Sequence, residues 1–278
     1  MRSHLPVWLL CGTAFALGAC TRKPAPAQAA ATVVTVSALD FAFTAPDTVP
    51  AGLVTFKLVG TGQEPHQMVV MRLDSGKTLA DLQPFLSAPD APIPGWLKFP
   101  IGVSVIVQGD TGNATAVLAP GRYAMACFIP SPDGVPHVAK GMVRAFEVAP
   151  NEAAPAPHPA ADITIIETDY DFEITGPLTA GTHTIRVENA GPQVHEVALN
   201  LLAPGKTLAD YQAWMQGGMR GEPPAKPVGG VTGPDVGGHI TFTATLVAGK
   251  YVLVCLVPDS KDFQPHVMHG MIKEITIT

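Results

Sequence analysis

The feature that most constrains this chain is an internal repeat. Residues 76–81 read Gly-Lys-Thr-Leu-Ala-Asp, and the same six residues recur at positions 205–210, a shift of 129. The same shift relates Asp40 to Asp169 and Phe43 to Phe172. Six consecutive identities at an offset that other positions share indicate a duplication. The 278 residues should therefore hold two copies of one domain instead of a single larger one.

The boundaries of the copies follow from composition. Residues 150–161 are rich in proline and alanine and have no apolar periodicity, which is typical of a semi-extended linker. We therefore expect one domain over residues 32–149 and the other over residues 162–278.

The first residues have the pattern of a targeting segment. A positive residue, Arg2, precedes an apolar stretch that is too short to span a bilayer, and residues 17–20 read Leu-Gly-Ala-Cys. This ending resembles the bacterial lipobox, which implies a signal peptide over 1–19, lipidation of Cys20 and a tether over 20–31. Thr21 in place of an aspartate favours the outer membrane, facing the periplasm, or the cell surface. An ordinary signal peptide cleaved nearby is the alternative.

Strand patterns dominate each copy. The 27 glycines and 28 prolines would interrupt helices often, and β-branched runs open the copies at residues 32–36 and 163–166. One helix per copy is expected after the shared segment, with Thr78 or Thr207 as N-cap, against an edge of the strands. Pro84 should shorten or kink the first of these helices. The fold class is thus all-β, with two β-sandwich domains that each carry one inserted helix.

Charge and motifs exclude several functions. The net charge is −6 and no basic run occurs, so we expect no nucleic-acid partner. The sequence also lacks a phosphate-binding loop, a nucleophile elbow and an HExxH motif.

The residues best suited to bind a metal or to react recur in the same order in both copies. Each copy has a histidine at the start of a strand, then a cysteine, a Pro-His pair and a Gly-Met pair, with spacings Cys-x9-His-x4-Met and Cys-x10-His-x4-Met. The residues are His66, Cys127, His137 and Met142 in the first copy and His195, Cys255, His266 and Met271 in the second. Taken singly, a cysteine of this kind is usually a small core residue, a methionine usually packs, and a histidine beside proline often serves a loop. A disulfide between Cys127 and Cys255 is less expected, because equivalent interior positions of two domains would have to meet within about 7 Å.

This arrangement resembles the cupredoxins, the blue-copper family. The resemblance is carried by Gly-Arg-Tyr-x3-Cys at 121–127, Gly-Lys-Tyr-x3-Cys at 249–255, and the following Pro-His and Gly-Met pairs. It implies two tandem cupredoxin-like Greek-key β-sandwich domains with one copper ion each. By resemblance the two histidines and the cysteine of each copy would be equatorial ligands, and the methionine a weak axial ligand.

The resemblance also bears on catalysis. Multicopper oxidases of this kind carry paired His-x-His motifs, which are absent, and nitrite reductases place a histidine directly before the ligand cysteine, where Ala126 and Val254 stand. We therefore expect that the chain is not an enzyme. Three functions stay open: electron transfer with a periplasmic redox partner, copper storage or delivery to a copper-handling protein, and a metal-free module that binds a protein.

Some polar residues differ between the two copies. Gln67 and Glu196 follow the first histidine of each copy, and His269 faces Lys140 in the alignment of the copies. For His269 we expect a surface position. We expect no specific role for the remaining histidines, which are His158, His183 and His239.

Overall fold

The computed structural model describes residues 31–74, 76–88, 92–152 and 156–278. The expected signal peptide, Cys20 and the tether up to residue 30 lie outside this part of the chain. No helix in the described part is both long and apolar enough to cross a membrane.

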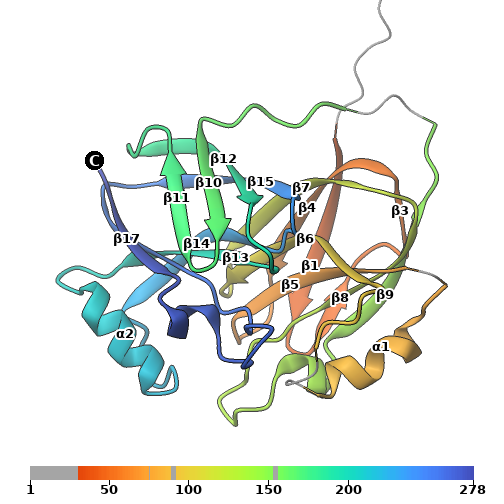
Figure 1. The fold of residues 1–278 in the computed structure, drawn as a ribbon, viewed down its shortest axis with the longest axis horizontal. Helices are drawn as coiled ribbons and strands as arrows, with labels where there is room; N and C mark the ends of the chain where they lie inside the picture. The colour runs from red at the N-terminus through yellow and green to blue at the C-terminus, as the bar shows by residue number, and fades with distance from the viewer. Residues whose placement is uncertain (1–30, 75, 89–91, 153–155) are drawn as a thin grey trace, which may run out of the picture.

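The first copy contains nine strands, one α-helix and one short 3-10 helix among its described residues (Figure 1). The strands are β1 (Thr32–Leu39), β2 (Ala42–Thr44), β3 (Thr48–Pro50), β4 (Gly52–Gly60), β5 (His66–Leu73), β6 (Leu97–Ile106), β7 (Thr111–Leu118), β8 (Gly121–Ala126) and β9 (Val143–Ala149). The helices are α1 (Leu79–Leu86) and η1 (His137–Lys140).

The second copy repeats this order with eight described strands. They are β10 (Ile163–Thr168), β11 (Asp171–Thr175), β12 (Gly181–Asn189), β13 (Glu196–Leu202), β14 (Ala225–Thr232), β15 (His239–Leu246), β16 (Gly249–Val254) and β17 (Ile272–Ile277). The helices are α2 (Leu208–Gln216) and η2 (His266–His269).

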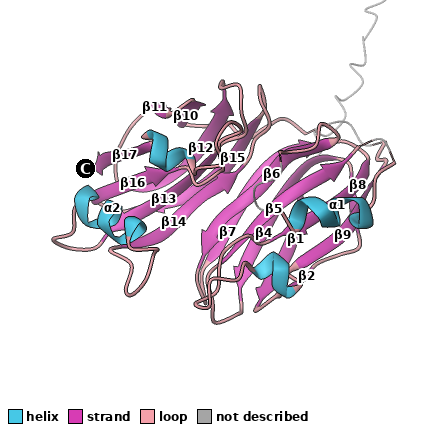
Figure 2. Ribbon diagram, turned by 60° about the horizontal axis from the view of Figure 1, so that its bottom comes forward, coloured by secondary structure: helices cyan, strands magenta, loops and turns pink. Residues whose placement is uncertain are grey.

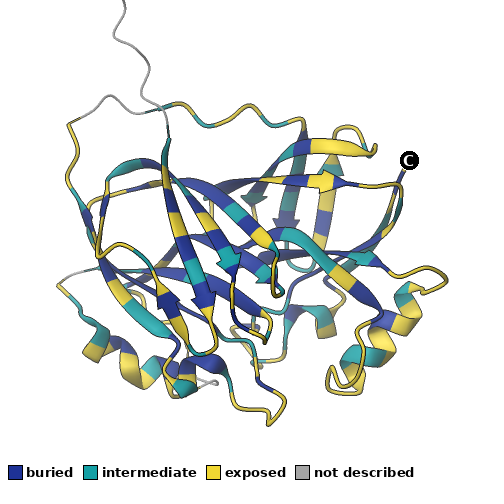
Figure 3. Cartoon of the chain, turned by 180° about the vertical axis from the view of Figure 1, so that it is seen from behind, coloured by how far each residue is buried: buried dark blue, intermediate teal, exposed yellow. Residues whose placement is uncertain are grey.

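Each copy folds as a sandwich of two sheets. In the first, β7-β4-β1-β2 faces β3-β9-β8-β5-β6, and in the second, β11-β10-β12-β15 faces β14-β13-β16-β17. Strand alternation decides which residues fill the sandwich: on β8, Tyr123 and Met125 point into the central core, whereas Ala124 and Ala126 point to the outer face. Figure 3 shows this alternation as buried and exposed bands along the strands. The all-β, two-sandwich prediction is confirmed.

The two helices begin where the sequence places them. Thr78 and Thr207 are the N-caps, and their backbone N–H groups donate to the carboxylates of Asp81 (2.9 Å) and Asp210 (2.8 Å). Pro84 lies within α1. The expected position at a sandwich edge is wrong for α1: Leu82 packs on the outer face of its sheet, in a cluster with Met71, Leu97 and Phe99. The side chains on this outer face are apolar, and the helix shields them from water.

The two sandwiches are joined more closely than a linker alone implies. β15 pairs with β7 through Thr241 and Thr115, so that one eight-stranded sheet runs through both copies. The Asn113 side chain extends this join: its amide donates to the carbonyl oxygen of Thr243 and its oxygen accepts from the N–H of the same residue, each at 2.8 Å. Figure 2 shows the two sandwiches side by side, and a single buried apolar cluster includes residues of both.

A second contact between the copies lies across β6 and β14. The side chain of Thr232 donates to the carbonyl oxygen of Met68 (3.3 Å). The backbone of Phe99 exchanges hydrogen bonds with Asp235, whose carboxylate accepts at 2.9 Å and whose N–H donates at 3.0 Å. A Cβ atom on Gly102 would lie 1.8 Å from the Thr232 hydroxyl oxygen, so the copies approach here at a distance that only glycine permits.

Candidate metal centres

The first candidate centre forms where β8 ends. Cys127 directly follows this strand, His66 opens the neighbouring β5, and His137 opens η1. The backbone ties the cysteine to the histidine loop, because the Cys127 N–H donates to the carbonyl of Met142 (3.2 Å) and the Met142 N–H donates to the carbonyl of His137 (2.9 Å). All four residues are fully buried. The fold therefore brings together the four residues that the repeat pattern singles out in this copy.

The distances within this cluster are short. The Nδ1 atoms of His66 and His137 lie 3.1 Å apart, and the Cys127 Sγ lies 3.5 Å from the Nδ1 of His137. The backbone N–H of Gln67 points at the same sulfur (3.4 Å). Two imidazole nitrogens that each lie about 2 Å from one ion are about 3 Å apart, so the two nitrogens already have the separation that a shared metal ion requires.

Two carboxylates hold the outer sides of the imidazole rings. Asp40 lies 3.2 Å from the Nε2 of His66, and Glu64 lies 2.8 Å from the Nε2 of His137. Backbone N–H groups of Gln63 and Glu64 donate to Asp40 and lower the pKa of its carboxyl group, which keeps it ionised. If each Nε2 carries the proton facing its carboxylate, both Nδ1 atoms present lone pairs to each other. A cation between them resolves that repulsion, so the donors fit a metal ion.

The second centre repeats this geometry in the other copy. The Nδ1 atoms of His195 and His266 lie 3.0 Å apart, and the Cys255 Sγ lies 3.4 Å from the Nδ1 of His266. Asp169 lies 2.8 Å from the Nε2 of His195, outside the angular range of a hydrogen bond, and Asp259 lies 3.8 Å from the Nε2 of His266. The carboxylates are therefore placed less tightly here than in the first copy.

The protonation states of the imidazoles in the metal-free protein favour metal binding. Burial lowers the pKa of His66 and His195, and burial together with the neighbouring His195 lowers the pKa of His266 to about 4. These rings are neutral at pH 7, which is the form that binds metals. Burial raises the pKa of Cys127 to about 11 and that of Cys255 well above 9.0, so both are thiols until a metal displaces the proton.

The other residues singled out in the sequence lie as follows. Met271, like Met142, is fully buried in the central core, beside the cysteine of its own copy through a backbone hydrogen bond of 3.2 Å. Cys127 and Cys255 are free thiols, so no disulfide joins the copies. His269 stacks on the ring of Tyr170 and contacts the exposed Asp262 at 3.2 Å.

The sequence reasoning missed the four carboxylates. One signal was available, because Asp40 and Asp169 are related by the repeat shift of 129. The other pair carries no such signal, since Glu64 corresponds to Gln193 and the carboxylate of the second copy comes from Asp259 in a different loop. Gln193 instead donates to Asp259 and, with Tyr170, holds the pKa of that carboxyl group low.

The second copy also buries two carboxyl groups that the first copy lacks. Glu167 stands where Ala38 stands in the first copy, is fully buried, and has no hydrogen-bond partner for either oxygen among the described residues. Glu196 stands where Gln67 stands and accepts a hydrogen bond from the N–H of Leu256 (3.0 Å). Burial raises the pKa of Glu196 to about 7.

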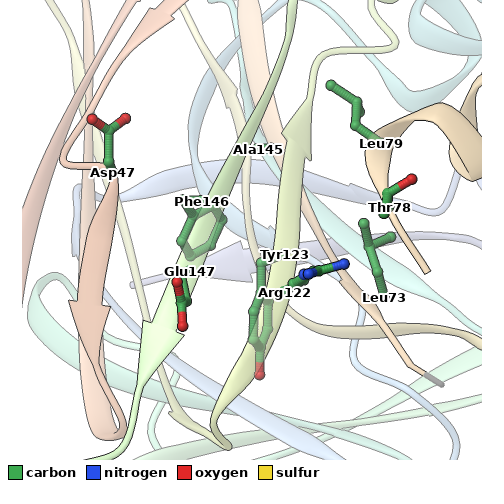
Figure 4. Close-up of a pocket in the computed structure, with 9 residues that line it drawn as sticks. All are labelled: Asp47, Leu73, Thr78, Leu79, Arg122, Tyr123, Ala145, Phe146 and Glu147. Carbon is green, nitrogen blue, oxygen red and sulfur yellow. The ribbon is translucent and has the colours of Figure 1, made fainter. Parts of the chain in front are cut away.

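One open pocket lies away from both centres. It has a volume of about 390 Å³ and contains none of the clustered histidines or cysteines. Figure 4 shows Phe146, Tyr123 and Arg122 in the middle of the pocket lining, with Asp47 to one side and Leu79 to the other. The chemistry of the two centres therefore does not extend into a substrate-sized cavity at this place.

Comparisons with known proteins identify only distant structural similarities. No protein-family model matches the chain, and no curated protein matches it either. Among solved structures, auracyanin from Roseiflexus castenholzii is 23% identical and covers 44% of this chain and all of its own, with a TM-score of 0.32. A blue copper oxidase from Nitrosomonas europaea is 15% identical over 89% of this chain and 86% of its own, with a TM-score of 0.27.

One expectation has to be corrected. Copper nitrite reductase from Nitrosomonas europaea is 16% identical over 90% of this chain and 94% of its own, with a TM-score of 0.25. This enzyme and the blue copper oxidase both match nearly the whole two-copy chain, so the expectation that the chain is not an enzyme is wrong.

The fold and the donor groups of the two centres indicate the same kind of domain. Each copy is a two-sheet sandwich, and each gathers two histidines and a cysteine, fully buried, at the end of the strand that precedes the cysteine. Two imidazoles, a thiolate and a weak thioether are the ligand set of a blue-copper centre. The chain is thus a tandem pair of cupredoxin-like domains.

Proposed function

We propose that each domain binds one copper ion and that the chain transfers electrons between proteins of the periplasm. The observation that carries the proposal is the pair of opposed imidazole nitrogens beside a buried cysteine, 3.1 Å apart in one domain and 3.0 Å apart in the other. The proposed ligands are His66, Cys127, His137 and Met142 in the first domain and His195, Cys255, His266 and Met271 in the second. Bound copper would supply a one-electron couple between its two common oxidation states.

The donor types favour copper over other metals. A soft thiolate with two imidazoles in one plane, and a weak fourth sulfur donor, suits copper, whereas structural zinc sites are tetrahedral with four strong ligands. The protein fixes its own donors, since Asp40 and Glu64 orient the imidazole rings and the Gln67 N–H orients the sulfur. Donors fixed in this way move little when the charge of an ion between them changes, which is what rapid electron transfer needs.

The contact between the domains supports a relay. Val194, which precedes His195, packs against the apolar cluster of the first domain that contains Val138, the residue after His137. Residues adjacent to ligands of the two proposed centres thus belong to one packed group. This continuity favours passage of an electron from one centre to the other within the chain.

The location belongs to the proposal as well. The Leu-Gly-Ala-Cys sequence at 17–20 supports a lipid anchor on Cys20 and attachment at the periplasmic face of the outer membrane or at the cell surface. The partner would be a periplasmic redox or copper-handling protein. Incorporation of labelled palmitate that is lost in Cys20→Ser would support the anchor, and unchanged incorporation would contradict it.

A copper titration of the full chain tests the proposed chemistry. We expect two equivalents of Cu(II) to produce an intense visible absorption band, because a thiolate bound to Cu(II) absorbs strongly. Cys127→Ser and Cys255→Ser should each remove about half of the absorbance, and the double variant should remove all of it.

The controls separate the alternatives. Met125→Leu, on the strand that precedes Cys127 but outside the donor set, should leave the band unchanged. Tight binding of Cu(I) without a visible band for Cu(II) would contradict electron transfer and favour storage or delivery. No uptake of either oxidation state would favour a metal-free protein-binding module.

A further inference from the structure

A third pair of histidines lies outside both centres. His158 belongs to the proline-rich linker, and His239 opens β15 in the second domain, 81 residues away in the sequence. Their Nε2 atoms lie 3.2 Å apart, and both side chains are half-buried. The fold therefore brings a linker imidazole within hydrogen-bond distance of a strand imidazole.

The geometry of this pair matches that of the two buried centres. The ring centroids are 4.4 Å apart with planes inclined at 57°, compared with 4.9 Å and 57° for His66 and His137, and 4.7 Å and 52° for His195 and His266. The facing nitrogens are 3.2 Å apart here and 3.1 and 3.0 Å apart there. Two imidazoles that share an ion at about 2 Å have this separation.

The charges around the pair suit a cation once the neighbouring carboxylate is counted. Glu188 is the direct cross-strand partner of His239 in the pairing of β12 with β15. Its carboxylate contacts Arg186, the nearby positive group, and so compensates the charge that would otherwise repel a cation. Burial, together with Arg186, lowers the pKa of both His158 and His239, so the imidazoles are neutral and can bind metal at pH 7.

We infer that His158 and His239 form a third metal site, which takes a divalent transition-metal cation of the kind that imidazole prefers, such as Cu²⁺ or Zn²⁺. The site differs from the buried centres because it has no cysteine and its histidines are partly exposed to solvent. A cation bound there fastens the linker to β15, two residues before Thr241, where the two domains share their sheet.

Electron paramagnetic resonance of the full chain tests this inference. With three equivalents of Cu²⁺ we expect a signal from the third equivalent that shows coupling to two nitrogens and the wide copper hyperfine splitting of a site without thiolate. His158→Ala should weaken binding of this third equivalent at least about tenfold, since removing even an outer partner of a metal ligand costs that much. His158 is a linker residue, so its replacement should leave both domains folded. His239→Gln provides a second variant with the same expected loss.

The control and the contradicting results are distinct from those of the proposed function. His183→Ala removes a histidine of the same domain that is held by Asp162 instead of another histidine, and it should leave the third signal unchanged. If the third equivalent binds equally well to His158→Ala, the inference is overturned and the ion lies elsewhere on the surface. The signal does not depend on the cysteines, so it should persist in the Cys127→Ser and Cys255→Ser double variant even if neither buried centre binds copper.

Discussion

Replacing Glu167 with alanine is expected to raise the free energy of unfolding of the metal-free protein by about 2 kcal/mol or more at pH 8. The carboxyl group is fully buried, and neither oxygen has a hydrogen-bond partner among the described residues. A buried polar group without a partner costs the free energy of its lost hydration, and an ionised one costs more. Ala38 occupies the equivalent position in the first domain, so the fold accepts alanine there.

The gain should depend on pH in one direction. Burial and the neighbouring Glu196 raise the pKa of Glu167 well above its ordinary value of 4.5. Between 4.5 and the raised value, the folded state holds a proton that the unfolded chain releases. The stability of the natural protein therefore falls as pH rises through that interval, and the advantage of Glu167→Ala should grow with it.

Chemical denaturation of both proteins at several pH values between 5 and 9 measures this difference. Glu173→Ala is the matched control, because Glu173 is an exposed residue of the adjacent strand β11, and it should shift the stability little at any pH. A natural protein and a Glu167→Ala variant of equal stability at pH 8 would show that an unseen partner satisfies the carboxyl group.

The second large effect is expected at Gly102, where the domains meet. In Gly102→Ala the new Cβ would lie 1.8 Å from the hydroxyl oxygen of Thr232 and 2.7 Å from the carbonyl oxygen of Met68. The carbonyl oxygen of Thr232 would be 2.9 Å away, so rotation of the threonine side chain cannot relieve the overlap. We expect a loss of about 1–3 kcal/mol or more, with the domains forced apart along β6 and β14.

Thermal unfolding should show this loss as a lower midpoint, by about 2–4 °C for each kcal/mol, and as two separate transitions if the domains uncouple. Gly95→Ala is the control, because a Cβ at that glycine would have no atom within 4 Å. An unchanged midpoint in Gly102→Ala would mean that the two domains do not hold this contact in solution.

Much of the fold could be predicted from the sequence because the same domain pattern occurs twice in the chain. The recurrence of Gly-Lys-Thr-Leu-Ala-Asp predicted both helix starts, and the repeated order of histidine, cysteine and histidine singled out side chains that the structure brings together. Repetition separates such residues from ordinary core residues, since a single buried cysteine such as Cys127 carries no signal by itself.

What could not be predicted depends on contacts between positions that have no repeat relation. Asp259 reaches toward His266 from a position where the first domain has Ser131, and Glu167 replaces an alanine. The cover of the outer sheet face by α1, and the pairing of His158 with His239, arise from tertiary packing. Local patterns describe each strand or loop but not which segment lies beside it.

The join between the domains has a consequence for how the chain arose. β7 and β15 are equivalent strands. The second copy has one residue fewer between the shared Gly-Lys-Thr-Leu-Ala-Asp segment and this strand, so the shift here is 128 and Thr115 corresponds to Thr243 and Asn113 to Thr241. Thr115 pairs with Thr241, and Asn113 forms hydrogen bonds with Thr243. Each of these contacts is the equivalent of the other with the two strands exchanged, so a local twofold axis relates β7 and β15. This is the isologous contact of a homodimer. A single copy would carry one self-complementary sheet edge, and the duplicated chain keeps both halves of that dimer in one polypeptide with the edge closed to other proteins.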